Sequence, residues 1–308
     1  MNELIERIQK NVGKVIVGKD SVITNIIKGI ICEGHILIED LPGMGKTTLV
    51  KAMAKTMDLS FSRIQFTPDL LPSDITGVSI YNPKDMNFEF RQGPVFANII
   101  LADEINRTSP KTQAALLEVM EESQVSEGNT SYQLEKPFVV LATQNPIEYE
   151  GTFNLPEAQL DRFIMKMSIG YPAKEDEMDI LRNFRADNPL DDLRSTVSRR
   201  DVMALIQMVR QVKVSDAIND YIVRLSNETR NSHLIAMGVS PRASLALMKL
   251  SQAEALISGR DYVIPDDVKA NVVLSFSHRI KLSGAARAKE LKEKDAIRQV
   301  LEFVRAPR

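Results

Sequence analysis

The spacing of hydrophobic positions changes near residue 172 of this chain. Up to that point, short apolar runs alternate with segments whose apolar residues recur at helical spacing, which is typical of buried strands joined by helices. From residue 174 onward only helical spacing is left. The pattern predicts an α/β unit over residues 1–188 and an all-α unit over 189–308, with 188–192 as the linker.

The predicted elements follow from the same spacing and from turn residues. Strands are expected at 36–38, 61–66, 97–103, 138–142 and 163–168. Helices are expected at 2–12, 20–32, 45–57, 110–122 and 155–163, then at 174–186, 201–211, 215–231, 242–259, 266–276 and 285–304. Two further segments, 78–91 and 123–135, each place turn residues between alternating runs, which predicts β-hairpins outside the core sheet.

Composition narrows the class of protein. The 308 residues are 44% hydrophobic and 26% charged, with a formal net charge of −2 and a pI near 6.0. These values are ordinary for a globular protein and argue against a broad basic surface for nucleic acid. No apolar run has the length of a membrane span or the form of a signal peptide, which favours a cytoplasmic protein. The one cysteine, Cys32, follows an apolar helical run and is expected to be a core residue.

A glycine-containing turn follows the first predicted strand and opens into a helix. This strand–loop–helix context is that of a phosphate-binding P-loop, although Asp40 replaces the first glycine of G-x-x-x-x-G-K-[ST]. The lysine would reach the β- and γ-phosphates, and the first threonine would ligate Mg²⁺. The expected nucleotide-binding residues are Pro42, Gly43, Met44, Gly45, Lys46, Thr47 and Thr48. The chain is therefore predicted to bind a nucleoside triphosphate.

Polar residues at the ends of two other strands add candidate chemistry. Asp103 and Glu104 end an apolar run, where the first would bind Mg²⁺ and the second would accept a proton from the attacking water, or orient it. Asn145 follows the next strand and either contacts the water or γ-phosphate or simply forms a turn before proline. The segment Val17–Gly18 is either an interhelix turn or a loop that approaches a purine ring.

Two arginines stand out by position. Arg162 ends a short predicted helix, and Arg242 lies in the first turn of another, where the helix dipole disfavours a cation. A solvated surface charge is the ordinary interpretation of Arg162, and a binding role is the alternative considered for Arg242.

The ordered motifs Gly43–Thr47, Ile100–Glu104, Asn145, Asp161–Phe163 and Ser240–Arg242 resemble those of an AAA+ ATPase. Longer blocks around them, such as Leu-Pro-Glu-Ala-Gln-Leu-Asp-Arg-Phe, are similar to the MoxR group, in the clade that carries an insert in helix 2. The resemblance covers nearly the whole chain and implies a P-loop αβα sandwich with a parallel sheet, two hairpin inserts and an all-α lid.

The resemblance also implies roles. Lys46 and Thr47 match Walker A, Asp103 and Glu104 match Walker B, and Asn145 matches sensor 1. Arg162 matches the arginine finger that acts on a neighbouring subunit, Arg242 matches sensor 2, and Val17–Gly18 matches the adenine-pocket segment. It further implies ATP and Mg²⁺ as cofactors and a homo-oligomeric, most often hexameric, ring. Such a ring would remodel or mature protein clients, including by cofactor or metal insertion, with a separate von Willebrand factor A-domain partner.

Other functions stay open at this stage. A nucleotide-switched scaffold would need binding but not hydrolysis, and a nucleic-acid motor or a magnesium-chelatase-like subunit would share the same motifs. The intact carboxylates and arginines favour an enzyme over a scaffold. The near-neutral charge disfavours a nucleic-acid motor, and nothing in the sequence points to a porphyrin.

Overall fold

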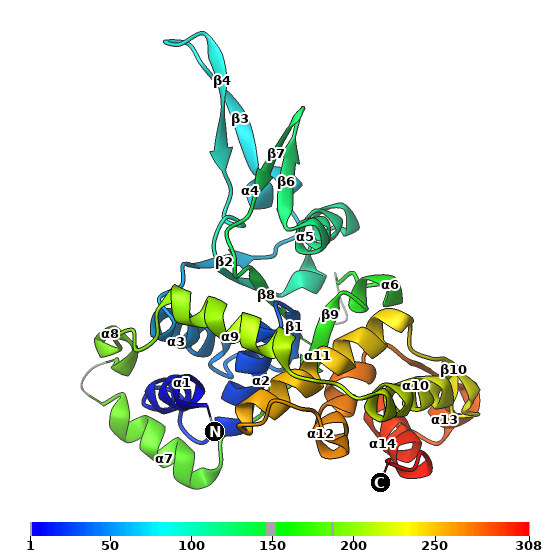
Figure 1. Cartoon of the computed structure of the whole chain (residues 1–308). Coiled ribbons are helices and arrows are strands. Elements are labelled where there is room, and N and C mark those ends of the chain that lie inside the picture. Colours follow the sequence, from blue (N-terminus) through cyan, green and yellow to red (C-terminus); the bar gives the residue numbers. More distant parts are fainter. Residues whose placement is uncertain (1, 146–151, 186–187, 308) are drawn as a thin grey trace.

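A five-stranded parallel sheet forms the centre of the molecule (Figure 1). The computed structural model describes residues 2–145, 152–185 and 188–307. The strands, in the order in which they pair, are β2 (Phe61–Gln65), β5 (Ile99–Asp103), β8 (Val139–Gln144), β1 (His35–Glu39) and β9 (Phe163–Met167). All four pairings are parallel, so the carboxyl ends of the strands share one edge of the sheet and the amino ends share the other.

Alternate residues of the three central strands, β5, β8 and β1, enter two different cores. Ile36 and Ile38 pack with α1 (Glu3–Gly13), α2 (Asp20–Ile31) and α3 (Lys46–Thr56), whereas Leu37 packs on the other face with α5 (Pro110–Glu122). Strand side chains alternate between faces, so a strand buried on both sides is apolar throughout, as these runs are. The predicted αβα sandwich is confirmed.

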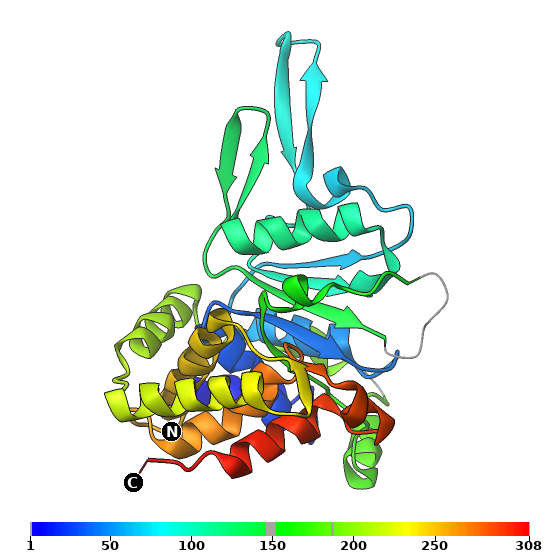
Figure 2. The same ribbon diagram turned by 90° about the vertical axis from the view of Figure 1, so that its right-hand side faces the viewer.

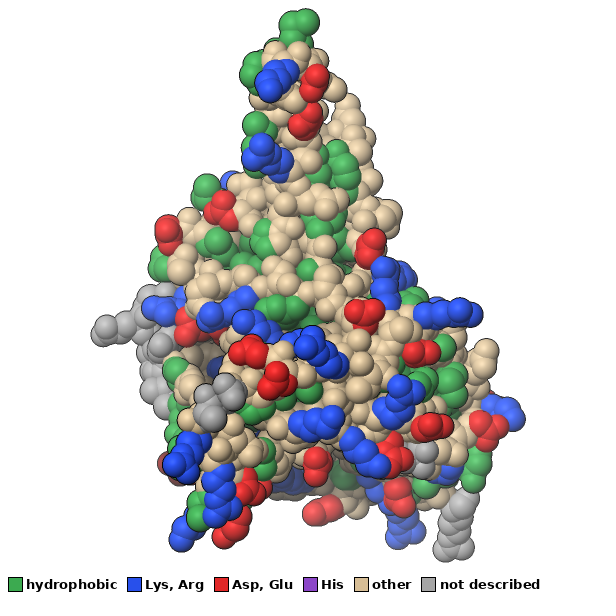
Figure 3. All heavy atoms as spheres, turned by 90° about the vertical axis from the view of Figure 1, so that its left-hand side faces the viewer, with side chains coloured by type: hydrophobic (Ala, Val, Ile, Leu, Met, Phe, Trp, Pro, Cys, Tyr) green, Lys and Arg blue, Asp and Glu red, His purple; other side chains and the backbone are tan. Residues whose placement is uncertain are grey.

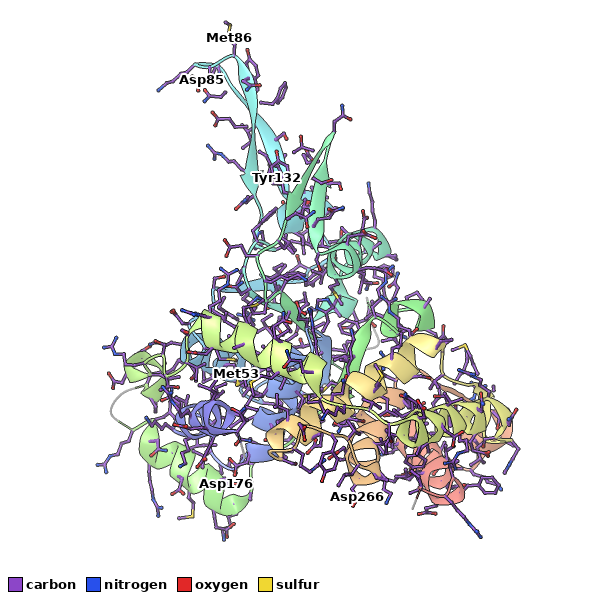
Figure 4. The ribbon with its side chains drawn as sticks, viewed as in Figure 1. Met53, Asp85, Met86, Tyr132, Asp176 and Asp266 are labelled. Atoms are coloured by element: carbon purple, nitrogen blue, oxygen red, sulfur yellow. The ribbon has the colours of Figure 1, made fainter. Side chains whose placement is uncertain are left out.

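Two hairpins leave this body on the side away from the C-terminal helices (Figures 1 and 2). The first, β3 (Gly77–Asn82) with β4 (Asn87–Gln92), follows the short helix α4 (Pro72–Thr76); the second is β6 (Gln124–Glu127) with β7 (Thr130–Gln133). The rings of Phe90 and Tyr132 stack 4.3 Å apart and join the hairpins. Asp85 and Met86 mark the tip of the longer one (Figure 4). The two predicted hairpins are confirmed.

Helices make up most of the chain after β9. They are α7 (Lys174–Asn183), α8 (Pro189–Asp192), α9 (Arg199–Gln211), α10 (Asp216–Asn231), α11 (Pro241–Ile257), α12 (Pro265–Phe276), α13 (Gly284–Ala288) and α14 (Glu293–Phe303). A small ladder joins β10 (Ile235–Met237) to β11 (Lys281–Leu282). Helices α11 and α12 contact β9, the edge strand of the main sheet. Within the described residues, no helix combines the length and the apolarity needed to cross a bilayer.

Three predicted elements differ from the structure. The single helix over 285–304 is wrong, because the turn between α13 and α14 places Glu290 at φ +56°, which a helix cannot continue through. The helix over 155–163 is reduced to α6 (Glu157–Leu160), for which Pro156 is the N-cap. The linker contains α8, whose first turn is capped by the Asn188 side chain. The boundary between the two units near residue 188 stays a prediction.

Candidate nucleotide-binding site

The P-loop joins β1 to α3 at the carboxyl edge of the sheet. Gly43 and Gly45 have φ values of +81° and +72°, a region in which glycine is favoured, and a Cβ at either position would meet no atom within 4 Å. The glycines are therefore needed for backbone shape, and the space beside them is open to a ligand. Lys46 begins α3 and donates from Nζ to the carbonyl oxygen of Asp40 at 2.9 Å, so its ammonium lies over the loop.

The departure from the P-loop pattern at Asp40 has a structural explanation. The side chain of this buried residue accepts hydrogen bonds from the backbone N–H groups of Ile169 and Gly170 and from the Ser168 hydroxyl. A glycine could make none of these contacts. Asp40 thus ties the start of the loop to the segment that leaves β9.

Asp103 at the end of β5 and the following Glu104 lie at the same edge, and one hydroxyl links the Asp103 carboxylate to the Glu104 backbone. Thr143 donates from Oγ1 to Asp103 Oδ1 at 2.7 Å and accepts from the Glu104 N–H at 2.8 Å. Glu104 has a left-handed φ of +58°, a strained value for a non-glycine residue. Arg63 holds the other oxygen of Asp103 with Nη2 at 2.6 Å, and Gln65 donates to Glu104 at 2.8 Å. Asn145 follows β8 directly and is buried.

An apolar cavity of about 380 Å³ adjoins the P-loop. It is lined by the loop after α1, by the P-loop and by α7; its residues include Val15, Ile16, Val17, Gly43, Met44, Gly45, Thr48, Ile180, Leu181 and Phe184. Gly18 does not line it but packs on α7, where a Cβ would lie 1.9 Å from Asp176 Oδ2 (Asp176 is labelled in Figure 4). A concave apolar surface beside a phosphate-binding loop suits a nucleotide base.

The donor set fits a nucleoside triphosphate with Mg²⁺. Backbone N–H groups at the start of α3, together with the Lys46 ammonium, are complementary to phosphate oxygens. The Thr47 hydroxyl and the Asp103 carboxylate are hard oxygen ligands of the kind that Mg²⁺ prefers. Asp103 accepts three hydrogen bonds, one from Thr143 and two from Arg63, which leaves one of the about four acceptor positions of a carboxylate for such a contact.

The two predicted arginines lie together at the opposite edge of the sheet. Arg162 and Arg242 both pair with Glu121, at the end of α5, through N–O distances of 2.8 and 3.2 Å. All three line a cavity of about 390 Å³ with His35, the first residue of β1, and Phe138, just before β8. No P-loop residue lines this cavity among the residues that the structure describes.

Comparisons with known proteins identify the family of the chain. Residues 35–165 match the ATPase family associated with various cellular activities (AAA), and residues 227–308 match an AAA lid domain. The chain is 41% identical to the chaperone MoxR1 of Mycobacterium tuberculosis, over 98% of this chain and 82% of that protein. The chain belongs to the MoxR-type AAA+ ATPases.

Two further relatives cover the MoxR-type chain almost completely. The uncharacterized protein YeaC of Bacillus subtilis is 46% identical over 100% of this chain and 96% of its own length. The crystal structure of a candidate ATPase from Cytophaga hutchinsonii superposes with a TM-score of 0.93 at 43% identity, covering 99% of this chain and 95% of that one. We refer to the helices from α11 to α14 as the lid, since the lid-domain match over residues 227–308 covers all of them.

The structure brings together part of the predicted site of this MoxR-type chain. Val17, Met44 and Thr48 line one cavity, and Asp103 and Glu104 share the Thr143 hydroxyl. Pro42 and Thr47 belong to the same loop and helix start but do not line that cavity. Pro146, the end of the predicted sensor motif, lies outside the described residues.

Several contacts of this site were not predicted from sequence. Thr143 lies two residues before Asn145, so a search for every polar residue at that strand end would have found it. Arg63 lies within a strand and carries no motif, and only the pairing of β2 with β5 places it beside Asp103. The apolar face of α7 shows helical spacing, but nothing in that spacing indicates which cavity it lines.

Proposed function

We propose that this protein is a Mg²⁺-dependent ATPase that works as a ring, in which Arg162 and Arg242 of one subunit complete the nucleotide site of the next. One observation carries the proposal: the arginines and the P-loop lie at opposite edges of one parallel sheet. Phe163, which follows Arg162, pairs with His35 at the amino end of β1, whereas the P-loop follows Glu39 at its carboxyl end.

The length of β1 makes the separation substantial. A strand advances about 3.3 Å per residue, so five residues separate the two edges by roughly 13 Å before the P-loop begins. The Arg162 and Arg242 side chains also point to Glu121 at the amino edge. A guanidinium held there serves a triphosphate on another copy of the chain. Head-to-tail contact of this kind, repeated, generates a ring when the rotation closes.

The residues of one subunit would divide the remaining work. Lys46 and the loop N–H groups would bind the β- and γ-phosphates, and Thr47 with Asp103 would hold Mg²⁺, which neutralises charge on the phosphate oxygens when it is bound. The Oε2 atom of Glu104 accepts from both Gln65 and Arg107. The Glu104 carboxylate would accept a proton from the attacking water, and Asn145 would orient that water.

The ring would act on protein clients. The first hairpin exposes apolar side chains far from the nucleotide site, with Met86 at 80% and Phe88 at 66% exposure. Figure 3 shows hydrophobic surface at this tip, while positive and negative side chains alternate over the body below it. Exposed apolar surface of this kind suits transient protein contacts. The hexameric stoichiometry, the von Willebrand factor A-domain partner and a role in cofactor insertion belong to the proposal through family resemblance.

Two variants test the proposal. Glu104→Gln should bind ATP and assemble but give no single-turnover hydrolysis, because the proton acceptor is lost. Arg162→Ala should keep ATP affinity while turnover in assembled particles falls by about 10³-fold or more, the range seen when an arginine finger is removed. Arg298→Ala, at an exposed arginine of α14, is the matched control and should keep full turnover. Normal hydrolysis by Glu104→Gln would remove Glu104 from its role, and normal turnover by Arg162→Ala would remove the shared site.

A further inference from the structure

A buried lid arginine binds the chain on both sides of Arg162. Arg279 follows α12, and its side chain is 2% exposed. It donates from Nε to Asp161 Oδ1 at 2.7 Å, from Nη2 to the carbonyl oxygens of Asp161 at 3.1 Å and Phe163 at 2.6 Å, and from Nη1 to the Ile164 carbonyl oxygen at 3.2 Å. Four of its hydrogen bonds therefore reach the segment that carries Arg162.

The same carboxylate also binds the helix that carries the second arginine. Asp161 Oδ2 accepts from the Ser240 hydroxyl at 2.7 Å, and Ser240 is the N-cap of α11. Arg242 lies in the first turn of that helix. One carboxylate thus joins the Arg162 segment, the start of α11 and Arg279.

Stability alone is a weak explanation for this arrangement. Burial lowers the pKa of Arg279 to about 10, although Asp161 acts in the opposite direction. A buried ion pair often contributes no more to stability than apolar residues of the same volume, so its geometry is the more informative property. A planar guanidinium that bonds Asp161, Phe163 and Ile164 at once fixes the direction of the segment between them, as a flexible ammonium cannot.

We propose that Arg279 is a positioning residue for Arg162: it fixes the arginine segment to the lid, so that Arg162 and Arg242 face the neighbouring subunit as one unit. The inference rests on the proposed function, because it requires Arg162 to act in the next subunit's site. The rate of a catalysed reaction depends steeply on the position of the catalytic group, and a displacement of about 1 Å can lower that rate by about 10²-fold.

The test uses mixed particles in which only one subunit type supplies Arg162. Glu104→Gln subunits cannot hydrolyse but have intact arginines, and Arg162→Ala subunits have an intact P-loop but no finger. Mixing them should restore ATP turnover at the Arg162→Ala sites. Arg279→Lys is then added either to the Glu104→Gln subunit, which donates Arg162, or to the Arg162→Ala subunit, which does not.

A positioning role predicts an asymmetric result. Arg279→Lys in the donating subunit should lower the restored turnover by about tenfold or more, with particle size and nucleotide affinity unchanged. The same change in the receiving subunit should leave turnover within about twofold. An equal loss in both arms would show general damage to the lid and overturn the inference, as would no loss in either arm.

The remaining outcomes are also decisive. If the Arg279→Lys donor fails to fold, Asp161→Asn in the same subunit keeps the side-chain shape while weakening the link, and should give a smaller donor-only loss of about threefold or more. Unchanged turnover in that arm would overturn the inference. If the unmodified pair restores no turnover although mixed particles form, the shared site itself is wrong and the inference falls with the proposed function.

Discussion

Glu121 is expected to restrain the two arginines in the isolated subunit. It pairs with Arg162 and Arg242 at once, so both guanidiniums must leave it before they can reach phosphate oxygens of a neighbour. Glu121→Gln removes the charge and keeps the shape. We therefore expect this variant to assemble and hydrolyse ATP at a lower protein concentration than the original chain, a gain rather than a loss.

The size of the gain follows from the exposure of the pairs. The side chains of Arg162, Arg242 and Glu121 are 26%, 47% and 39% exposed, so water screens the attraction. Ion pairs of this kind contribute about 0.2–1 kcal/mol each, which places the restraint near 1 kcal/mol for the two contacts. A difference of about 1 kcal/mol corresponds to a change of about fivefold in the half-maximal concentration.

The assay is specific ATP turnover against protein concentration at fixed saturating ATP and Mg²⁺. Glu122→Gln is the matched control, because this exposed residue neighbours Glu121 at the end of α5 and removes the same charge. The control should not shift the curve. A curve for Glu121→Gln that is unchanged or moved to higher concentration would refute the reasoning and show that Glu121 orients the arginines for use.

Three further predictions follow from the site. Gly18→Ala should weaken binding of a fluorescent ATP analogue, because Gly18 has a φ of +67° and an added Cβ would overlap Asp176 of α7. The control Gly13→Ala should bind normally, because a Cβ there meets no atom within 4 Å. Equal affinities of the two variants would contradict the packing argument. Arg63→Gln should lower the Mg²⁺ concentration for half-maximal turnover by about fivefold, since a competing cation leaves Asp103; a higher Mg²⁺ requirement would show that Arg63 supports the metal site. Burial lowers the pKa of His35 from 6.5 to about 4, so the unfolded chain takes up the proton first and stability is lost as pH falls through this range, by about 1.4 kcal/mol per pH unit. The free energy of unfolding, measured with urea between pH 6.5 and 5, should fall less steeply with decreasing pH in His35→Gln than in the original chain. An identical pH dependence would assign the effect to other groups.

Local signals were sufficient to predict most elements of the core. The glycine-containing turn after β1, followed by Lys46 and Thr47, is specific to a P-loop. The strands β5 and β8 are buried on both faces, so each is a continuous apolar run that is easily recognised in the sequence. The hairpins followed from turn residues between short β-like runs. The long C-terminal helix was predicted wrongly because the left-handed residue between α13 and α14 is Glu290, whose identity does not indicate such a turn.

The geometry of the site could not be predicted in the same way. The spacing of motifs along the sequence does not show which edge of the sheet Arg242 reaches, because its position depends on how the lid packs on β9. Asp40 looked like a departure from a motif, and only the fold shows that its carboxylate binds the chain after β9. No role was predicted for Arg279, because only the fold places its guanidinium against the segment that carries Arg162.

The central claim is that a single subunit holds an incomplete reaction site. The most direct measurement is ATP turnover per subunit together with particle mass, in one dilution series at saturating ATP and Mg²⁺. We predict that turnover per subunit falls in proportion to the assembled fraction and is lost where only monomers remain, while monomers still bind ATP. Constant turnover per subunit down to concentrations at which only monomers are present would contradict the account.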